Sequence, residues 1–301
     1  MKIKQKKIYI YCSESSLEKI RQTLQPYDVE VIFNEHNLTS FKGKILLHHE
    51  LSLVSKEERN FLVNATERGA WVEPLVSFLD RVLGYTEVEL LQSSYFLHTK
   101  AFTILSTKRT QVVKRILDLF FSMILLLLTL PIMIATAIAI KISSEGPIFY
   151  SQKRVGLFNK EFKVLKFRSM RTDAESSGAQ WAQKNDDRVT QVGHFIRKTR
   201  IDELPQLVNV ILGEMSLVGP RPEREVFVKD LEKDISYYRF RHSVKPGVTG
   251  LAQVSYPYGA SLEDAIWKHK YDIYYINHHR TLFDLYIILK TVKVVLFGMG
   301  R

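Results

Sequence analysis

The chain has 301 residues, of which 46% are hydrophobic and 25% are charged, a balance typical of globular proteins that excludes a disordered chain. Its net charge of +11 is uneven: residues 1–99 carry 12 Lys/Arg and 13 Asp/Glu, whereas residues 100–301 carry 31 and 19. Cys12 is the only cysteine, which excludes a disulfide framework and a cysteine metal site. The first residues are basic but lack the long apolar core of a signal peptide, so none is expected.

Residues 1–105 are predicted to form a small, Rossmann-like α/β accessory domain. Short β-rich runs at 7–12, 29–33 and 44–48 alternate with amphipathic stretches at 17–24 and 56–65, which predicts a parallel sheet with crossover helices. No glycine-rich dinucleotide fingerprint follows the first run. We therefore expect a regulatory or interaction module.

Residues 106–142 are predicted to form a membrane-associated helix. The stretch 119–140 contains no charged residue and is long enough for a bilayer helix, while Pro131 near its middle favours a kink. Basic residues flank both ends, and positive charge marks the cytoplasmic side of a membrane. A re-entrant helix that returns to the side it entered is therefore favoured over a span.

Residues 143–301 are predicted to form a mainly helical α+β catalytic domain with interfacial amphipathic helices. Its basic surplus favours anionic lipid and phosphorylated small molecules over nucleic acid. The apolar stretch 281–297 contains Lys290 and Lys293, and it fits a helix in the membrane interface as well as a core helix. Both alternatives stay open at this point.

Two adjacent carboxylates, Asp202 and Glu203, lie beside Arg200 and just ahead of an apolar helical pattern. Because neighbouring residues cannot share one face of a helix, the two should have separate roles. One carboxylate could attack phosphorus while the other binds Mg²⁺, which takes one or two carboxylates besides phosphate oxygens. Taken alone, the pair is better explained as helix N-terminal acids, so the catalytic interpretation depends on the surrounding motifs.

Arg221 lies between Pro220 and Pro222, which restrict the backbone on both sides of a guanidinium suited to phosphate. Lys166 and Arg168 alternate with apolar residues, so on a strand they would share one side and could line an anionic pocket. Asp272 lies among aromatic residues and could assist substrate or metal binding. Structural roles compete with each of these interpretations.

Taken in order, these motifs resemble those of the bacterial sugar transferase family, the polyprenyl-phosphate sugar-1-phosphate transferases of the monotopic type with one re-entrant membrane helix. The resemblance covers about residues 110–299. The matching parts are Lys114-Arg115 with Asp118, the apolar segment with its proline, and residues 152–156, 166–170, 202–206, 218–222 and 246–254.

The resemblance implies an enzyme that transfers a sugar-1-phosphate from a UDP-sugar to undecaprenyl (polyprenyl) phosphate and releases UMP. Asp202 would be the nucleophile of a covalent intermediate, and Glu203 would hold the Mg²⁺ cofactor. The residues expected to bind substrate are Arg154, Lys166, Arg168, Arg200, Arg221 and Asp272.

The resemblance also implies a location at the bacterial inner membrane, with the catalytic domain facing the cytoplasm, and a role in initiating exopolysaccharide, capsule, O-antigen or glycoconjugate synthesis. Membrane lipid, a second copy of the chain and downstream glycosyltransferases are the expected partners, whereas nucleic acid is not. Two departures from the family pattern are Leu130 before Pro131, where serine is common, and Ala252, where tryptophan is common.

Three other functions compete with this interpretation. A membrane-anchored scaffold or regulator would need the apolar segment and the basic surplus, but not Asp202, Glu203 and Arg221 together. A nucleic-acid-binding protein would use the same positive charge, yet no known binding motif is present. A lipid-phosphate hydrolase is the third alternative, and sugar-independent release of phosphate from polyprenyl diphosphates would indicate it.

Overall fold

The computed structural model describes residues 7–98, 108–174, 186–257, 259 and 261–296, which is the part of the chain discussed below. The chain divides into two compact units, Met1–Ala101 and Phe102–Arg301. Each unit is described by itself.

The first unit contains a four-stranded parallel sheet in the order β2-β1-β3-β4, as the alternating pattern predicts. Its strands are β1 (Lys7–Tyr11), β2 (Glu30–Phe33), β3 (Ile45–His48) and β4 (Trp71–Pro74). Its helices are α1 (Glu14–Leu24), α2 (Lys56–Glu67), α3 (Leu75–Leu83) and α4 (Ser93–His98), with short 3₁₀ turns η1 (Gln25–Tyr27) and η2 (Val88–Leu90).

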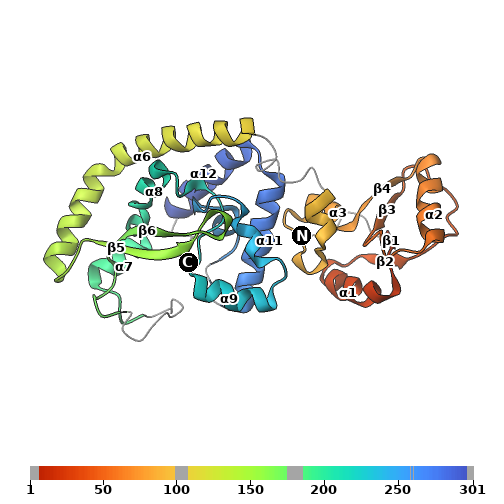
Figure 1. Ribbon diagram of the computed structural model, residues 1–301, viewed down its shortest axis with the longest axis horizontal. Coiled ribbons are helices and arrows are strands. Elements are labelled where there is room, and N and C mark those ends of the chain that lie inside the picture. Colours follow the sequence, from red (N-terminus) through yellow and green to blue (C-terminus); the bar gives the residue numbers. More distant parts are fainter. Residues whose placement is uncertain (1–6, 99–107, 175–185, 258, 260, 297–301) are drawn as a thin grey trace. The chain divides into compact units, whose positions relative to one another are not determined.

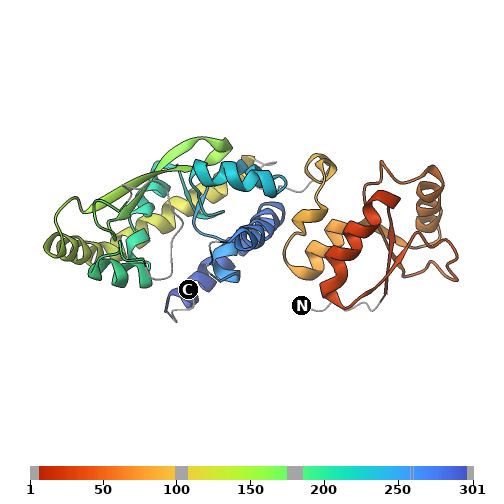
Figure 2. The same ribbon diagram turned by 90° about the horizontal axis from the view of Figure 1, so that it is seen from below.

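Helices cover both faces of this sheet. Tyr11 and Leu46 project from one face and pack with Leu62 and Ala65 of α2. Helices α1 and α3 lie on the opposite face (Figures 1 and 2). The inner strands β1 and β3 therefore contain several buried residues, whereas the edge strands β2 and β4 are mostly half-buried or exposed.

The second unit begins with α6 (Lys108–Ser143), a helix of 36 residues that contains Pro131 and follows a long curved path in Figure 1. Among the described residues it is the one helix long and apolar enough to cross a membrane. Most of its apolar side chains are exposed, for example Leu127 at 70% and Ile142 at 82%. A soluble core helix would have buried this surface.

The rest of the second unit is built from short elements. A hairpin of β5 (Phe149–Val155) and β6 (Glu161–Phe167) is antiparallel, and β7 (Ser216–Val218) pairs in parallel with β8 (Gly247–Thr249). The helices are α7 (Gln191–Lys198), α8 (Gln206–Leu212), α9 (Glu225–Asp234), α10 (Leu251–Ser255), α11 (Leu262–His278) and α12 (Thr281–Leu296). The 3₁₀ turns are η3 (Leu157–Asn159), η4 (Ile201–Glu203) and η5 (Tyr238–Ser243). The chain is therefore mixed α/β with one long apolar helix.

Both ends of α6 are tied to this second unit. Near its start, Arg115 donates to the carbonyl oxygens of Val210 and Ile211 at 2.6 and 2.8 Å, where α8 ends. Near its end, Ile140 is buried in a cluster with Phe167 and Ile196. The two ends of the apolar helix therefore contact the same globular body.

Candidate active site

The two carboxylates lie on η4, which local backbone geometry places between α7 and α8. Arg200 adopts the left-handed conformation (φ 59°), which ends α7 and turns the chain into η4. Pro205 then begins α8, where a missing amide hydrogen is tolerated. Asp202 and Glu203 are both buried, at 8% and 7% exposed.

Asn209 on α8 holds the hairpin beside η4. Its side chain accepts from the amide of Leu165 at 3.0 Å and donates to the carbonyl of Lys163 at 2.8 Å. This pairing fixes the register of β6 against α8 and brings Lys166 to Glu203. Asn209 is 44 and 46 residues away from these two strand residues, so no local sequence pattern could link them.

Glu203 lies within a ring of cations from three segments. Its Oε1 accepts from Arg221 Nη2 at 2.6 Å and from Lys166 Nζ at 3.2 Å, and it lies 3.8 Å from Arg200 Nη1. Burial raises the pKa of Glu203, but these three cations outweigh burial and hold the pKa well below its usual range. Glu203 is therefore ionised at physiological pH.

Asp202 has the opposite shift. Burial, followed by repulsion from the Glu203 carboxylate, raises the pKa of Asp202 to about 6, although Lys166, Arg221 and Arg200 offset part of the rise. Its Oδ1 is buried and has no hydrogen-bond partner among the described residues. A buried carboxylate oxygen without a donor is rare in proteins, and it keeps its lone pairs available to a reactant.

Arg221 lies on a loop whose preceding residue pair packs closely against the backbone of residues 245–247. A Cβ on Gly219 would lie 2.5 Å from the carbonyl oxygen of Lys245, and one on Gly247 would lie 2.1 Å from the nitrogen of Gly219. The close approach of these two backbones requires both glycines. The prolines at 220 and 222 restrict the loop further, as the sequence predicts.

Arg154 extends the positive region behind this loop. Its Nη1 donates to Glu223 Oε2 at 3.3 Å and to the carbonyl of Pro222 at 3.4 Å. Lys166, Arg200 and Arg221 thus contact Glu203 directly, while Arg154 supports the loop that carries Arg221. The positive charges exceed the two site carboxylates, which suits a diphosphate.

Arg168 does not join this group, contrary to the expectation that it shares a side with Lys166. Strand β6 ends at Phe167, and the Arg168 guanidinium turns to the end of α6, where it donates to the carbonyl oxygens of Ser144, at 2.8 Å, and Glu145. Gly146, beside this guanidinium, has a φ of 118°, a backbone conformation that favours glycine. In this structure Arg168 anchors the residues that follow α6, and its expected role in substrate binding stays a prediction.

Asp272 does not line the site either. Its side chain is 1% exposed, and its Oδ2 accepts from Arg241 Nη2 at 2.7 Å. Burial raises the pKa of Asp272 to about 6, and Arg241 offsets part of that rise. The structure therefore shows Asp272 in a buried ion pair with Arg241, and its expected contact with substrate stays a prediction.

Sequence reasoning missed Arg241 and Glu223. Both lie in segments without a recognisable motif, and Glu223 follows Pro222 directly. An arginine among the aromatic residues Tyr238 and Phe240 was a signal that a buried carboxylate should exist, because a buried guanidinium needs a partner. The sequence does not indicate which carboxylate supplies it.

A magnesium ion fits the carboxylates of η4. Among the described residues, no cluster of three or more His, Cys, Asp or Glu side chains could hold a metal. Mg²⁺ needs no such cluster, since one or two carboxylates with phosphate and water complete its shell. Glu203 Oε2, which accepts from Arg221 Nη1 at 3.4 Å, is the oxygen that could bind it.

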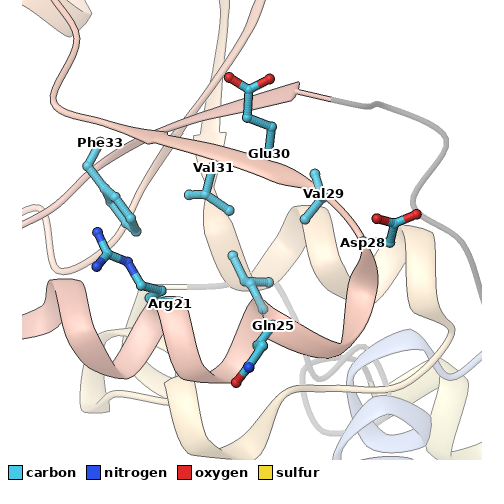
Figure 3. A pocket seen from close by; sticks show the side chains of 8 residues that line it. Arg21, Gln25, Asp28, Val29, Glu30, Val31 and Phe33 are labelled. Carbon is cyan, nitrogen blue, oxygen red and sulfur yellow. The ribbon is translucent and has the colours of Figure 1, made fainter.

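A separate hollow of about 740 Å³ lies in the first unit, beside the edge strand β2. Arg21 and Gln25 of α1 and Val31 and Phe33 of β2 line it (Figure 3). It contains none of the residues predicted to bind substrate. We place the functional site at Asp202 and Glu203 because the charges and the unpartnered oxygen are there.

Comparison with known proteins identifies the family to which the second unit is similar. The family model described as bacterial sugar transferase matches residues 109–298. The UDP-N-acetylgalactosamine-undecaprenyl-phosphate N-acetylgalactosaminephosphotransferase of Aeromonas hydrophila is 46% identical over 188 residues, which are 62% of this chain and 44% of the relative.

Two relatives named UDP-glucose:undecaprenyl-phosphate glucose-1-phosphate transferase are also similar. That of Xanthomonas campestris pv. campestris is 43% identical, over 62% of this chain and 39% of the relative. That of Escherichia coli strain K12 is 40% identical, over 60% of this chain and 40% of the relative. The match spans less than half the length of each of these three relatives. Because the family model covers most of the second unit, including η4 and the loop of Arg221, the chain belongs to the bacterial sugar transferase family.

Proposed function

We propose that this protein transfers a sugar-1-phosphate from a UDP-sugar to undecaprenyl phosphate or a related polyprenyl phosphate, through a covalent intermediate on Asp202. One observation carries the proposal: Asp202 has a buried, unpartnered oxygen, while its neighbour Glu203 is held by three cations. The names of the relatives, all undecaprenyl-phosphate sugar phosphotransferases, support the same reaction.

In the first step, Asp202 Oδ1 attacks the phosphorus atom that carries the sugar. The bond between that phosphorus and the bridging oxygen breaks, and UMP leaves with the bonding electrons. Lys166, Arg200 and Arg221 lie where they can neutralise the diphosphate and stabilise the charge that develops on UMP. The product of this step is a sugar-phosphate esterified to Asp202.

In the second step, a phosphate oxygen of the polyprenyl phosphate attacks the same phosphorus, and the Asp202 carboxylate leaves. The product is a polyprenyl diphosphate sugar. Covalent catalysis divides the transfer between two chemically different substrates, one soluble and one lipid, so that a single cationic site serves both in turn.

Magnesium is part of the proposal, with Glu203 as its protein ligand. When bound, Mg²⁺ supplies positive charge to the phosphate oxygens. Glu203 could contribute Oε2 to the ion while Oε1 keeps its contacts with Arg221 and Lys166.

The helix α6 is proposed to enter and leave the bacterial inner membrane on the cytoplasmic side. A straight helix of 36 residues is about 54 Å long, far more than the bilayer core of about 30 Å. If α6 crossed the bilayer, its two ends would lie in different compartments. The contacts of Arg115 and Ile140 with the same unit support the re-entrant arrangement instead.

Helix α12 is proposed to lie in the membrane interface. Leu282, Leu289 and Val292 are 79%, 62% and 50% exposed, and they follow the helical spacing of one face. Ile287 on the opposite face is fully buried. The exposed stripe favours the interfacial alternative over a core helix.

The first unit is proposed to be a Rossmann-like accessory domain within residues 1–105. Along the chain it is followed by the membrane helix of 106–142 and the catalytic domain of 143–301. The parallel strand order β2-β1-β3-β4 supports this interpretation. The expected biological role is the initiating step of exopolysaccharide or related glycoconjugate synthesis.

The test uses the full chain in nanodiscs with Mg²⁺, undecaprenyl phosphate and a panel of UDP-sugars that includes UDP-glucose and UDP-N-acetylgalactosamine. UMP release with one donor, together with a phosphorylated Asp202 peptide when the lipid is left out, supports the reaction and its intermediate. If every donor fails with folded protein and accessible lipid, a non-catalytic scaffold or regulator replaces the enzyme. Activity that survives in Asp202→Asn rejects the covalent step.

A further inference from the structure

The loop that carries Arg221 is held through its carbonyl groups. Two of its residues are prolines and have no amide hydrogen, so regular secondary structure cannot fix it. Instead, each carbonyl oxygen from residue 220 to 223 accepts from a separate donor. These donors are the nitrogen of Gly247 at 2.9 Å, Arg241 Nη2 at 3.0 Å, Arg154 Nη1 at 3.4 Å and the nitrogen of Val155 at 2.8 Å, in that order.

The donor to Arg221 is itself fixed in place. Arg241 is 2% exposed, and its Nη2 contacts both the carbonyl oxygen of Arg221 and Oδ2 of Asp272, at 3.0 and 2.7 Å. Its Nη1 donates to the Tyr238 hydroxyl at 2.6 Å. The guanidinium therefore connects η5, the middle of α11 and the backbone of the Arg221 loop.

The two histidines near the ion pair of Arg241 and Asp272 carry no charge. His242 and His269 are buried near Arg241, and burial, with the positive charge of Arg241, lowers the pKa of each to about 3. Both rings are neutral at physiological pH. Asp272 is therefore the carboxylate that balances Arg241 at 2.7 Å.

We propose that Arg241, held by Asp272, is a positioning residue: by fixing the carbonyl of Arg221 it aims the Arg221 guanidinium at Glu203 and at the donor phosphates. The inference rests on the proposed transferase function. The carbonyl lies on the same residue whose guanidinium reaches Glu203 at 2.6 Å, so a shift of the loop moves that guanidinium directly. A misplacement of about 1 Å can slow a reaction about 100-fold.

The first experiment compares Arg241→Lys with the native chain in the nanodisc assay for UMP release. Lysine keeps the charge that balances Asp272, but its single ammonium cannot reproduce the planar fork that reaches the carboxylate and the carbonyl together. We expect kcat to fall by about 30- to 100-fold while KM for the UDP-sugar changes less than about 3-fold. A kcat within about 2-fold of native overturns the proposal.

A second variant separates positioning from folding. Arg241→Met combined with Asp272→Leu removes both buried charges together, an exchange that proteins often tolerate without loss of stability. The expected result is a native melting temperature with the same loss of kcat. Val228→Ala, a buried apolar truncation on α9, is the matched control for reduced packing in the same unit. It should lower the melting temperature and leave kcat per folded molecule unchanged.

A double-mutant cycle with Arg221→Ala tests whether Arg241 acts through the Arg221 guanidinium. If Arg241 acts through the Arg221 guanidinium, Arg241→Lys should reduce kcat by less than about 2-fold in the Arg221→Ala background. An equal loss in both backgrounds would mean that Arg241 acts elsewhere. Failure of the native chain to release UMP from any donor counts against the proposed function, whereas native activity that Arg241→Lys retains counts against this inference alone.

Discussion

Asp202 and Glu203 are adjacent in the chain and nearly equally buried, yet their pKa values are shifted in opposite directions. The Glu203 carboxylate contacts Arg221, Lys166 and Arg200, and these cations hold its pKa well below the usual range. Burial, followed by repulsion from Glu203, raises the pKa of Asp202 to about 6, and the nearby cations offset only part of this rise. This difference between the two carboxylates supports the separate roles proposed for them.

Asp202→Asn should abolish activity without weakening the fold. We expect UMP release to fall by more than about 10³-fold, because the amide cannot act as the nucleophile. The measurement is single-turnover UMP release, beside a thermal unfolding curve. Asp230→Asn, at an exposed carboxylate on α9, is the control and should keep native activity.

The same substitution should stabilise the protein above pH 7. The folded-state pKa of Asp202 is raised, so its favourable contribution exists below the unfolded pKa and is lost as the pH rises through about 6. At pH 8 the ionised carboxylate opposes folding, and the neutral amide removes that effect, by on the order of 2 kcal/mol. Unfolding in urea at pH 8 and pH 5 checks this, and an equal difference at both values would contradict the shift.

The rate of UMP release should fall as the pH drops through about 6. Protonation of Asp202 removes the nucleophile, and its pKa lies near that value in the free protein. The profile of kcat/KM between pH 5 and 8 reports it. A rate that stays constant down to pH 4.5 would show that the reacting group titrates lower.

Glu203→Gln should destabilise the second unit as well as reduce activity. Replacing the carboxylate leaves Lys166, Arg200 and Arg221 without their shared anion, and breaking a buried ion pair in this way costs about 3 kcal/mol. Because the Glu203 pKa is depressed, its contribution is present above the unfolded pKa and is lost as the pH falls through the lower folded value. The loss measured at pH 7 should therefore shrink in strong acid.

Arg168→Ala should affect stability and leave catalysis intact. Its guanidinium satisfies carbonyls at the end of α6, so its removal should cost about 2 kcal/mol. Once corrected for the folded fraction, kcat and KM should match the native values. A large rise in KM for the UDP-sugar would return Arg168 to the substrate site.

The re-entrant arrangement of α6 predicts that both of its ends face the same compartment. Arg109→Cys and Glu145→Cys, each in a Cys12→Ser background, should react with a membrane-impermeant maleimide only when the cytoplasmic face is accessible. Leu127→Cys, in the apolar middle, is the protected control. Labelling of the two ends from opposite sides would establish a membrane span instead.

The sequence by itself determined the features that depend on local pattern. Alternating apolar runs predicted the parallel sheet of the first unit, and an uncharged stretch predicted α6, because both follow from periodicity along a short segment. Motif order was also sufficient to indicate the family, since Asp202, Glu203 and Arg221 lie in segments whose residue types are legible without a structure.

Only the tertiary structure decided how those residues are used. Lys166 and Arg168 are two positions apart, yet one contacts Glu203 and the other α6, because β6 ends between them. Asp272 pairs with Arg241, 31 positions away, and so belongs to the interior. Burial raises the pKa of both carboxyl groups, and cations from distant segments then lower that of Glu203 far more than that of Asp202. No local pattern records which cation reaches which oxygen.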